Sequence, residues 1–362
     1  MADPARIRFE EVSLGSGRCL GVATLDSEET LNALSLPMAH ALDAQLVRWA
    51  EREDVACVLL RGEGERAFSA GGDIQDLYRA MVKNHAAGAT VDDTPDRFFE
   101  AEYRLDYRIH TFPKTVVAFG RGFVMGGGLG LYSASAVRVV TPTTRIAMPE
   151  VTIGLFPDAG ATWILRGLPP HLALFLGATG TRMDAADALY AGLGTHFTGS
   201  DCDPVAALVG ADGDPDRAFD ADPALETGSL EMADPVLAEA LPEIPADAAG
   251  ARAALEALAG VGDWFGRGLA TMRGGCPTTV GIVCEQLRRS PALDLADCFR
   301  MEMTIASRCA RFADFAEGVR ALIVDKDGAP RWRNDGAQEH VLAHFEPPWE
   351  INPLFDLGRT GT

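Results

Sequence analysis

Apolar residues recur along this chain with two periods, one typical of strands and one typical of helices. Residues 7–12 and 20–25 alternate apolar and polar positions, which predicts a two-stranded hairpin. Short or continuous apolar runs predict further buried strands, at residues 56–60, 115–119, 137–140 and 146–148. Glycine-rich turns follow several of these runs, so we expect stacked units of strand, turn and helix rather than a dinucleotide-binding βαβ fold.

Apolar residues spaced three and four positions apart predict helices, at residues 36–52, 98–109, 261–272, 280–287 and 295–310. Residues 201–249 are instead rich in Asp, Pro and Ala, and we interpret them as a surface connection with short helices. We therefore expect four consecutive parts: a core over 1–200, an acidic Pro/Ala-rich connection over 201–262, a helical segment over 263–346 that packs on the core, and a tail over 347–362.

The composition indicates a globular protein and disfavours several partners. The 362 residues are 47% hydrophobic, with a mean hydropathy of +0.04, which is enough for a sizeable core. The net charge of −20 opposes binding to nucleic acid or to anionic membranes. No run of about 18 apolar residues is present to cross a bilayer. Residues 1–14 lack an apolar stretch, so we expect no secretory signal.

The seven cysteines are scattered and odd in number, and none has CxxC spacing. This pattern favours reduced, mostly structural thiols in a cytoplasmic protein. His340 and His344 have the i, i+4 spacing of metal ligands on a helix, but no Cys or carboxylate motif accompanies them. We interpret them as a surface pair and expect no metal site.

The residues best suited to chemistry lie in and beside glycine-rich turns. Glu150 and Asp158 stand eight residues apart, across a turn rich in Gly and Pro. Two earlier turns, 68–73 and 125–130, can present bare backbone N–H groups to a developing oxyanion. Together with carboxylates that can act as nucleophile, base or acid, they indicate chemistry on a carbonyl. Taken alone, Glu150 is also compatible with an exposed turn and Asp158 with a helix N-cap.

A third carboxylate lies on an apolar helical face. The face is formed by Phe98, Glu102, Leu105 and Ile109. A carboxylate on such a face is costly to bury unless it is paired or used, so Glu102 is a candidate site residue. A salt bridge or a position at the helix edge is the alternative. The glycines of 126–130 are, by themselves, equally compatible with close packing of a helix on a strand.

Several segments together resemble the crotonase (enoyl-CoA hydratase/isomerase) superfamily. They are Leu31-Asn32-Ala33-Leu34 and residues 67–74, 125–130 and 147–158. The resemblance covers roughly residues 5–200, and it continues in C-terminal segments, at residues 276–279, 317–321, 325–327 and 330–332. It implies an α/β fold with a ββα spiral core and a helical C-terminal segment.

The resemblance also implies site residues. It places an oxyanion hole at the N–H groups of Ala70 and Gly127, catalytic carboxylates at Glu150 and Asp158, and substrate contacts at Glu102, Gly127, Glu150 and Asp158. Hydratases of the superfamily have a second glutamate at the position of Gly130 and usually a glycine at the position of Asp158. At both positions this chain instead follows the thioester hydrolases of the superfamily.

By this resemblance the substrate is an acyl-coenzyme A. Residues 28–30 lack the basic residue that the superfamily often has beside the CoA phosphates, so Arg66 and Lys326 are candidates for that contact. The other CoA-binding candidates are Ala70, Gly72 and Asp73. Coenzyme A would be part of the substrate, and the resemblance implies no separate cofactor.

The implied reaction is hydrolysis of a short branched 3-hydroxyacyl-CoA thioester to the free hydroxy acid and CoA. Glu150 would attack the carbonyl or activate water, Asp158 would orient that water or take the complementary proton role, and Glu102 would contact the substrate hydroxyl. Two alternatives stay open: an enoyl-CoA hydratase or isomerase that uses Glu150 alone, and a non-catalytic acyl-CoA-binding protein. The expected partner is this small molecule, and self-association as a homo-oligomer stays open.

Overall fold

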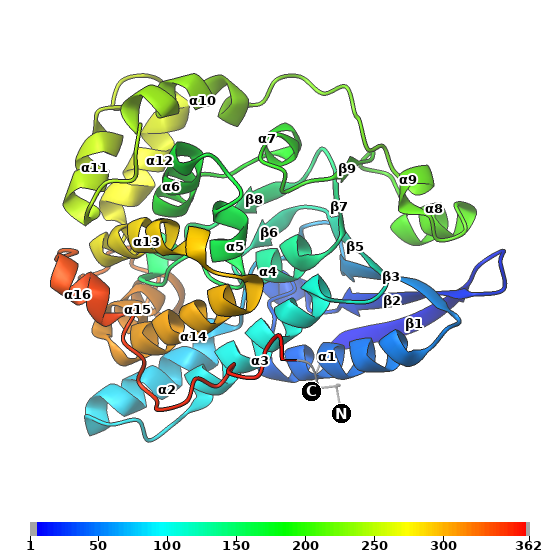
Figure 1. The fold of residues 1–362 in the computed structure, drawn as a ribbon, viewed down its shortest axis with the longest axis horizontal. Coiled ribbons are helices and arrows are strands. Elements are labelled where there is room, and N and C mark those ends of the chain that lie inside the picture. The colour runs from blue at the N-terminus through cyan, green and yellow to red at the C-terminus, as the bar shows by residue number, and fades with distance from the viewer. Residues whose placement is uncertain (1–5, 360–362) are drawn as a thin grey trace. The chain divides into compact units, whose positions relative to one another are not determined.

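The computed structural model of this chain describes residues 6–359, so the start of the N-terminal segment and the end of the predicted tail lie outside the described residues. The chain divides into two compact units, each built from three segments (Figure 1). Unit 1 contains Met1–Gly72, Leu105–Ile146 and Arg182–Met232, and unit 2 contains Asp73–Arg104, Ala147–Thr181 and Ala233–Thr362. The units alternate along the sequence, whereas the parts expected from the sequence are consecutive.

A six-stranded sheet lies at the centre of unit 1, in the order β1-β2-β3-β5-β7-β9. Its strands are β1 (Ile7–Ser13), β2 (Cys19–Leu25), β3 (Val55–Gly62), β5 (Thr115–Gly120), β7 (Val137–Val140) and β9 (His196–Phe197). β1 pairs antiparallel with β2, as the predicted hairpin, and the remaining pairs are parallel. A second sheet has the order β4-β6-β8, with β4 (Ala67–Ser69), β6 (Phe123–Met125) and β8 (Arg145–Ala147).

The parallel strands of unit 1 are apolar along most of their length because both faces of the sheet are covered. Leu59 and Val117 belong to one buried cluster, which also contains Leu208 and Phe219 from the segment after β9. That segment forms the short helices α8 (Pro204–Gly210) and α9 (Pro215–Ala218). The short helices are as predicted, and most of residues 201–249 are exposed or half-buried, but Leu208 and Phe219 help to close the core.

The predicted helices are confirmed, with ends that differ by a few residues. Unit 1 contains η1 (Glu28–Thr30), α1 (Leu36–Glu51), α4 (Gly127–Ala134) and α7 (Ala185–Tyr190), and both units share α3 (Thr94–His110) and α10 (Ser229–Ala240). Unit 2 contains α2 (Ile74–Ala87), η2 (Pro149–Ile153), α5 (Ala161–Leu165), α6 (Pro170–Thr179), α11 (Ala248–Glu256), α12 (Asp263–Gly274), α13 (Pro277–Arg289), η3 (Ser290–Ala292), α14 (Leu295–Arg311), α15 (Ala313–Val319), η4 (Arg320–Val324) and α16 (Gln338–Ala343).

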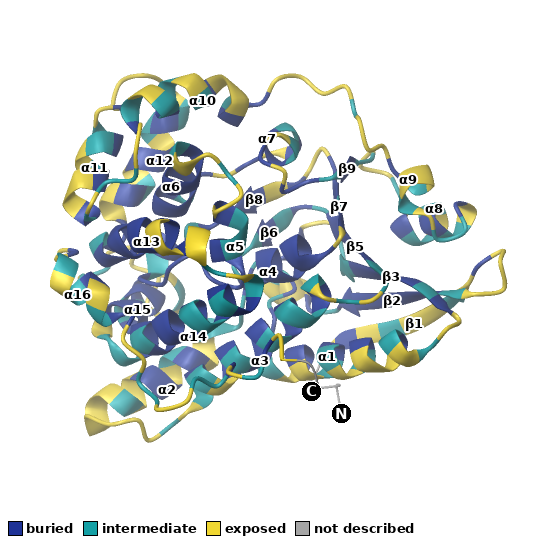
Figure 2. Cartoon of the chain, viewed as in Figure 1, coloured by how far each residue is buried: buried dark blue, intermediate teal, exposed yellow. Residues whose placement is uncertain are grey.

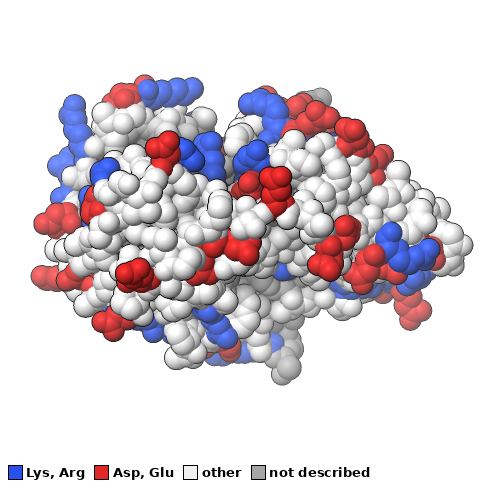
Figure 3. All heavy atoms as spheres, turned by 90° about the horizontal axis from the view of Figure 1, so that it is seen from above, with Lys and Arg blue, Asp and Glu red and all other residues white. Residues whose placement is uncertain are grey.

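Burial follows the elements closely, as Figure 2 shows: the inner strands and one face of most helices are buried. On the face drawn in Figure 3, acidic and basic side chains are interspersed, so the net charge of −20 does not form one continuous acidic surface there.

All seven cysteines are unpaired thiols. Within residues 6–359, no helix combines the length and the apolar character needed to cross a bilayer.

Candidate active site

Two glycine turns of unit 1 lie against each other where β4 ends and α4 begins. A Cβ atom added to Gly71 would lie 3.9 Å from the Gly127 nitrogen, and one added to Gly128 would lie 2.5 Å from the Ser69 Cβ. Gly71 also has a φ of +117°, which L side chains rarely adopt. Glycine at these positions therefore brings two stretches of bare backbone together, as the sequence predicts for residues 68–73 and 125–130.

The hydrogen bonds within these turns correct one predicted donor. The Ala70 N–H donates to the Leu31 carbonyl oxygen at 3.0 Å. Because this bond uses the only hydrogen on that nitrogen, the prediction that Ala70 serves an oxyanion is wrong. Gly72 lies two residues further along the same turn. Among the described residues, neither its N–H nor that of Gly127 donates to another backbone carbonyl, so these two donors are available.

Four of the buried carboxylates of unit 2 have a raised pKa. They are Glu102 on α3, Glu150 in η2, Asp158 in the loop before α5, and Glu302 on α14, with exposed fractions of 2%, 4%, 9% and 0%. One oxygen each of Glu102 and Glu150, Oε1 and Oε2 respectively, has no hydrogen-bond partner within the described part of the chain. Because a buried carboxylate oxygen without a donor is costly, these two atoms are suited to accept a hydrogen bond from a ligand or water.

Burial raises the pKa of all four carboxylates. The pKa of Asp158 rises to about 7 and that of Glu302 to about 8, although hydrogen bonds to each lower the value in part. The pKa values of Glu102 and Glu150 lie well above the usual range because of burial first and the charge of Asp158 second. Carboxyl groups that titrate near neutral pH are suited to proton transfer, which makes this cluster a candidate catalytic centre.

The helix that follows Asp158 excludes the structural alternative for that residue. Gly160, and not Asp158, is the N-cap of α5. The Asp158 carboxylate instead accepts a hydrogen bond from the Tyr103 hydroxyl, with 2.7 Å between the oxygens. Gly130 lies inside α4 and is buried, so it brings no carboxylate to its turn.

The predicted CoA contacts are more dispersed. Asp73 is the N-cap of α2, where its carboxylate accepts the N–H of Gln75 at 3.3 Å. Arg66, in unit 1, and Lys326, in unit 2, are both exposed. Their side chains are free to move in solvent, so the phosphate contact stays a prediction for both.

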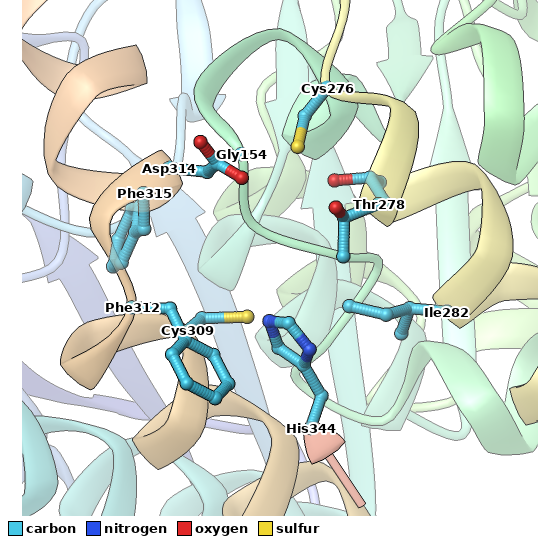
Figure 4. Close-up of a pocket in the computed structure, with 10 residues that line it drawn as sticks. Gly154, Cys276, Thr278, Ile282, Cys309, Phe312, Asp314, Phe315 and His344 are labelled. Atoms are coloured by element: carbon cyan, nitrogen blue, oxygen red, sulfur yellow. The ribbon is translucent and has the colours of Figure 1, made fainter. Parts of the chain in front are cut away.

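The interpretation of His340 and His344 as a surface pair is wrong for His344. His344 is buried, with its ring 4.6 Å from the Phe312 ring, and burial lowers its pKa to about 4. Figure 4 shows that it lines a cavity with the thiols of Cys276 and Cys309. The buried carboxylate of Asp314 lines this cavity, but Glu102, Glu150, Asp158 and Glu302 do not. Within residues 6–359, no group of three or more His, Cys, Asp or Glu side chains is arranged to hold a metal.

Sequence reasoning missed Glu302 as a site residue and gave Tyr103 no role of its own. The signal that identified Glu102 is present around Glu302 as well. The face formed by Cys298, Glu302, Ile305 and Cys309 has the same spacing as the face formed by Phe98, Glu102, Leu105 and Ile109. A search for carboxylates on apolar helical faces would have found both.

Comparison with known proteins places this chain in a family. A profile of the enoyl-CoA hydratase/isomerase family matches residues 20–345, so the chain belongs to that family. Solved structures agree on the crotonase fold. An enoyl-CoA hydratase from Rhodobacter sphaeroides 2.4.1 has 33% identity and a TM-score of 0.82, covering 94% of this chain and 97% of that one. A carnitinyl-CoA dehydratase from Mycobacterium thermoresistibile has 30% identity and a TM-score of 0.84, covering 96% and 98%.

Curated relatives are named for a different activity from that of the hydratase and dehydratase structures. The 3-hydroxyisobutyryl-CoA hydrolase, mitochondrial, of Xenopus tropicalis is 36% identical over 341 residues, covering 92% of this chain and 87% of that protein. The protein of the same name from Homo sapiens is 32% identical over 362 residues, covering 93% and 89%. The names of relatives thus divide between water addition or removal and thioester hydrolysis.

Proposed function

We propose that this protein is an acyl-CoA hydrolase that cleaves a short branched 3-hydroxyacyl-CoA, similar to 3-hydroxyisobutyryl-CoA, into the hydroxy acid and CoA. The observation that carries the proposal is the combination of two buried carboxylates, Glu150 and Asp158, with a glycine at position 130. The curated relatives named as hydrolases support it over nine-tenths of the chain.

Glu150 is the group that we assign to the first bond-forming step. In its charged form it attacks the thioester carbonyl carbon or removes a proton from the attacking water. Its Oε2 atom, which has no partner within the described residues, is available for either role. Asp158 orients the water or exchanges the complementary proton, and its pKa of about 7 suits both protonation states near neutral pH.

The negative charge that develops on the thioester oxygen needs two donors. We assign them to the N–H groups of Gly72 and Gly127, because the Ala70 N–H already donates to Leu31. Glu102, with its unpartnered Oε1, is assigned to the substrate hydroxyl.

The competing function is hydration or isomerisation of an enoyl-CoA, which the names of the similar solved proteins favour. That chemistry needs a second proton-transfer group where this chain has Gly130, and a buried glycine cannot provide one. A non-catalytic acyl-CoA-binding role is the remaining alternative, and it gives no reason for four buried carboxylates.

The test is a thiol-release assay with the purified full-length protein and a panel of short acyl-CoAs, with and without a 3-hydroxyl and a branch. We expect release of CoA thiol, fastest with the branched 3-hydroxyacyl member. Loss of enoyl absorbance from crotonyl-CoA without thiol release would identify a hydratase instead. Binding of acyl-CoA with neither signal would identify a non-catalytic binder.

A further inference from the structure

The Asp158 carboxylate is held by a side chain whose own position is fixed by packing. The Tyr103 hydroxyl donates to Asp158 Oδ2 at 2.7 Å. The Tyr103 ring is fully buried, and its centroid lies 5.8 Å from the Phe99 ring and 6.0 Å from the Phe299 ring. Because aromatic neighbours on α3 and α14 fix the ring, its hydroxyl has little freedom to leave Asp158.

The backbone that follows Asp158 is held by a second buried acid. Glu302 Oε2 accepts the N–H of Gly160 at 2.7 Å, and Glu302 Oε1 accepts the N–H of Thr162 at 2.8 Å. Both oxygens of this carboxylate are therefore used within four residues of Asp158. Because both oxygens of one side chain on α14 accept from this backbone, Glu302 restricts where the loop after Asp158 can lie.

α13 holds the carbonyl groups of the same loop. Gln286 Nε2 donates to the Pro157 oxygen at 3.0 Å and to the Thr162 Oγ1 atom at 2.8 Å. The Thr279 hydroxyl donates to the Leu155 oxygen. Side chains on α3, α13 and α14 thus hold residues 155–162, and each of these side chains belongs to unit 2.

The buried carboxyl group of Glu302 is difficult to explain by structure alone. It is 0% exposed, burial opposes its charged form, and the charge of Asp158 opposes it further. A neutral side chain could satisfy a loop N–H at a smaller desolvation cost. A buried acid beside another buried acid is instead typical of sites in which position and charge both serve the reaction.

From this geometry we propose that Tyr103 and Glu302 are positioning residues for Asp158: Tyr103 orients the carboxylate through its hydroxyl, and Glu302 fixes the backbone that carries it. The inference rests on the proposed thioester hydrolysis and assigns no substrate contact to either residue. Both residues therefore affect turnover only through the position of Asp158.

The first test is Tyr103→Phe, which removes the donor and keeps the ring in its stack. We expect kcat to fall about 10-fold with KM nearly unchanged, on the scale of one lost hydrogen bond to a charged group. The matched control is Tyr132→Phe, because the buried Tyr132 hydroxyl has no partner within the described residues. The control should keep the activity of the wild type.

The pH profile separates positioning from a general loss of packing. The Tyr103 hydrogen bond lowers the pKa of Asp158, so its removal should shift the acidic limb of kcat to higher pH. The titratable groups that act on Asp158 or are acted on by it are Glu102, Tyr103, Glu150, Glu302 and Cys309. A loss of packing would lower the amount of folded enzyme and leave the limb in place.

A double-mutant cycle tests whether Tyr103 acts through Asp158. In an Asp158→Asn background, Tyr103→Phe should change kcat less than 2-fold. Independent, multiplicative effects would overturn the proposal, as would wild-type kcat and pH profile in Tyr103→Phe. Wild-type protein that releases no thiol from any acyl-CoA would overturn the proposed function, and this inference with it. Thiol release by the wild type with an inert Tyr103→Phe would overturn the inference alone.

Glu302 provides a second route if Tyr103→Phe does not fold. Glu302→Gln keeps one acceptor oxygen for the loop, whereas Glu302→Ala keeps none. We expect kcat to fall in both variants, and less in Glu302→Gln, with KM nearly unchanged. Equal kcat in wild type and Glu302→Ala, measured on folded protein, would show that Glu302 has no part in positioning Asp158.

Discussion

Glu102 and Glu302 are both buried in unit 2, and the negative charge of Glu302 raises the pKa of Glu102. Both side chains also interact with the charge of Asp158. Neighbouring buried carboxyl groups cannot all be ionised without a large free-energy cost, so their protonation states are coupled. The predictions below follow from this coupling and from the contacts of each residue.

Glu150→Gln should lower kcat by roughly 100-fold or more, with little change in KM. The substitution removes the charge needed for attack or for proton removal. Loss of a catalytic base or nucleophile usually lowers kcat by about this factor. Steady-state thiol release measures both constants. The matched control is Glu53→Gln at an exposed glutamate, which should behave as the wild type. A Glu150→Gln enzyme that keeps most of its kcat would remove Glu150 from the mechanism.

Asp158→Asn should abolish most turnover while Tm stays the same or rises. The folded-state pKa of Asp158 is raised to about 7, so this group stabilises the fold below its unfolded pKa and loses that contribution as pH rises through 7. Tm of the wild type should therefore fall more between pH 5 and pH 8 than Tm of Asp158→Asn. Asp247→Asn, at the N-cap of α11, is the control for a capping aspartate and should keep full activity. Near-normal turnover in Asp158→Asn would leave Glu150 as the sole catalytic carboxylate and favour an isomerase.

The kcat of the wild type should fall as the pH drops below about 7. In the proposed mechanism Asp158 orients water in its charged form, and burial raises its pKa to about 7. Burial also raises the pKa of Glu150 well above its usual range, so protonation of Glu150 should add to the loss of kcat at low pH. Thiol release between pH 5.5 and 8.5, corrected for the reaction without enzyme, gives the profile. A kcat that does not change across this pH range would contradict the roles proposed for both Asp158 and Glu150.

Glu102→Gln should weaken discrimination for the substrate hydroxyl. If Glu102 Oε1 accepts a hydrogen bond from that hydroxyl, kcat/KM should fall about 10-fold or more for the 3-hydroxyacyl-CoA. The same substitution should leave kcat/KM for the matching acyl-CoA without a hydroxyl nearly unchanged, which makes this substrate the control. Equal losses for both substrates would show that Glu102 acts in the chemistry or the fold rather than in recognition.

The wild type should hydrate crotonyl-CoA slowly or not at all. Gly130, buried in α4, leaves the turn without the second carboxylate that hydration uses. The decrease in enoyl absorbance reports hydration, and the thiol assay on the same sample reports hydrolysis. Hydration at a rate comparable to thioester cleavage would show that the hydrolase assignment is wrong.

The elements of this fold were predictable because their apolar periods are long and regular. The same kind of pattern identified Glu102, since an acid on an apolar helical face is visible in the sequence alone. The error at Ala70 has a different origin: which N–H of a turn is already bonded depends on where Leu31 lies, and no local pattern encodes that. Tyr103 and Glu302 were missed as partners of Asp158 because their hydrogen bonds join residues far apart in the sequence.

The alternation of the two units has a consequence for synthesis of the chain. Unit 2 draws its first segment from residues near position 100 and its last from the C-terminal third. During translation, α3 emerges long before α14, so Glu102 and Tyr103 stay hydrated until the ribosome has made Glu302. A nascent chain halted before α14 would hold Asp158 without the acid that fixes its loop. Because burial raises the pKa of these carboxyl groups, we expect the raised values only in a chain that includes α14, and we expect a chain that ends before α14 to be inactive.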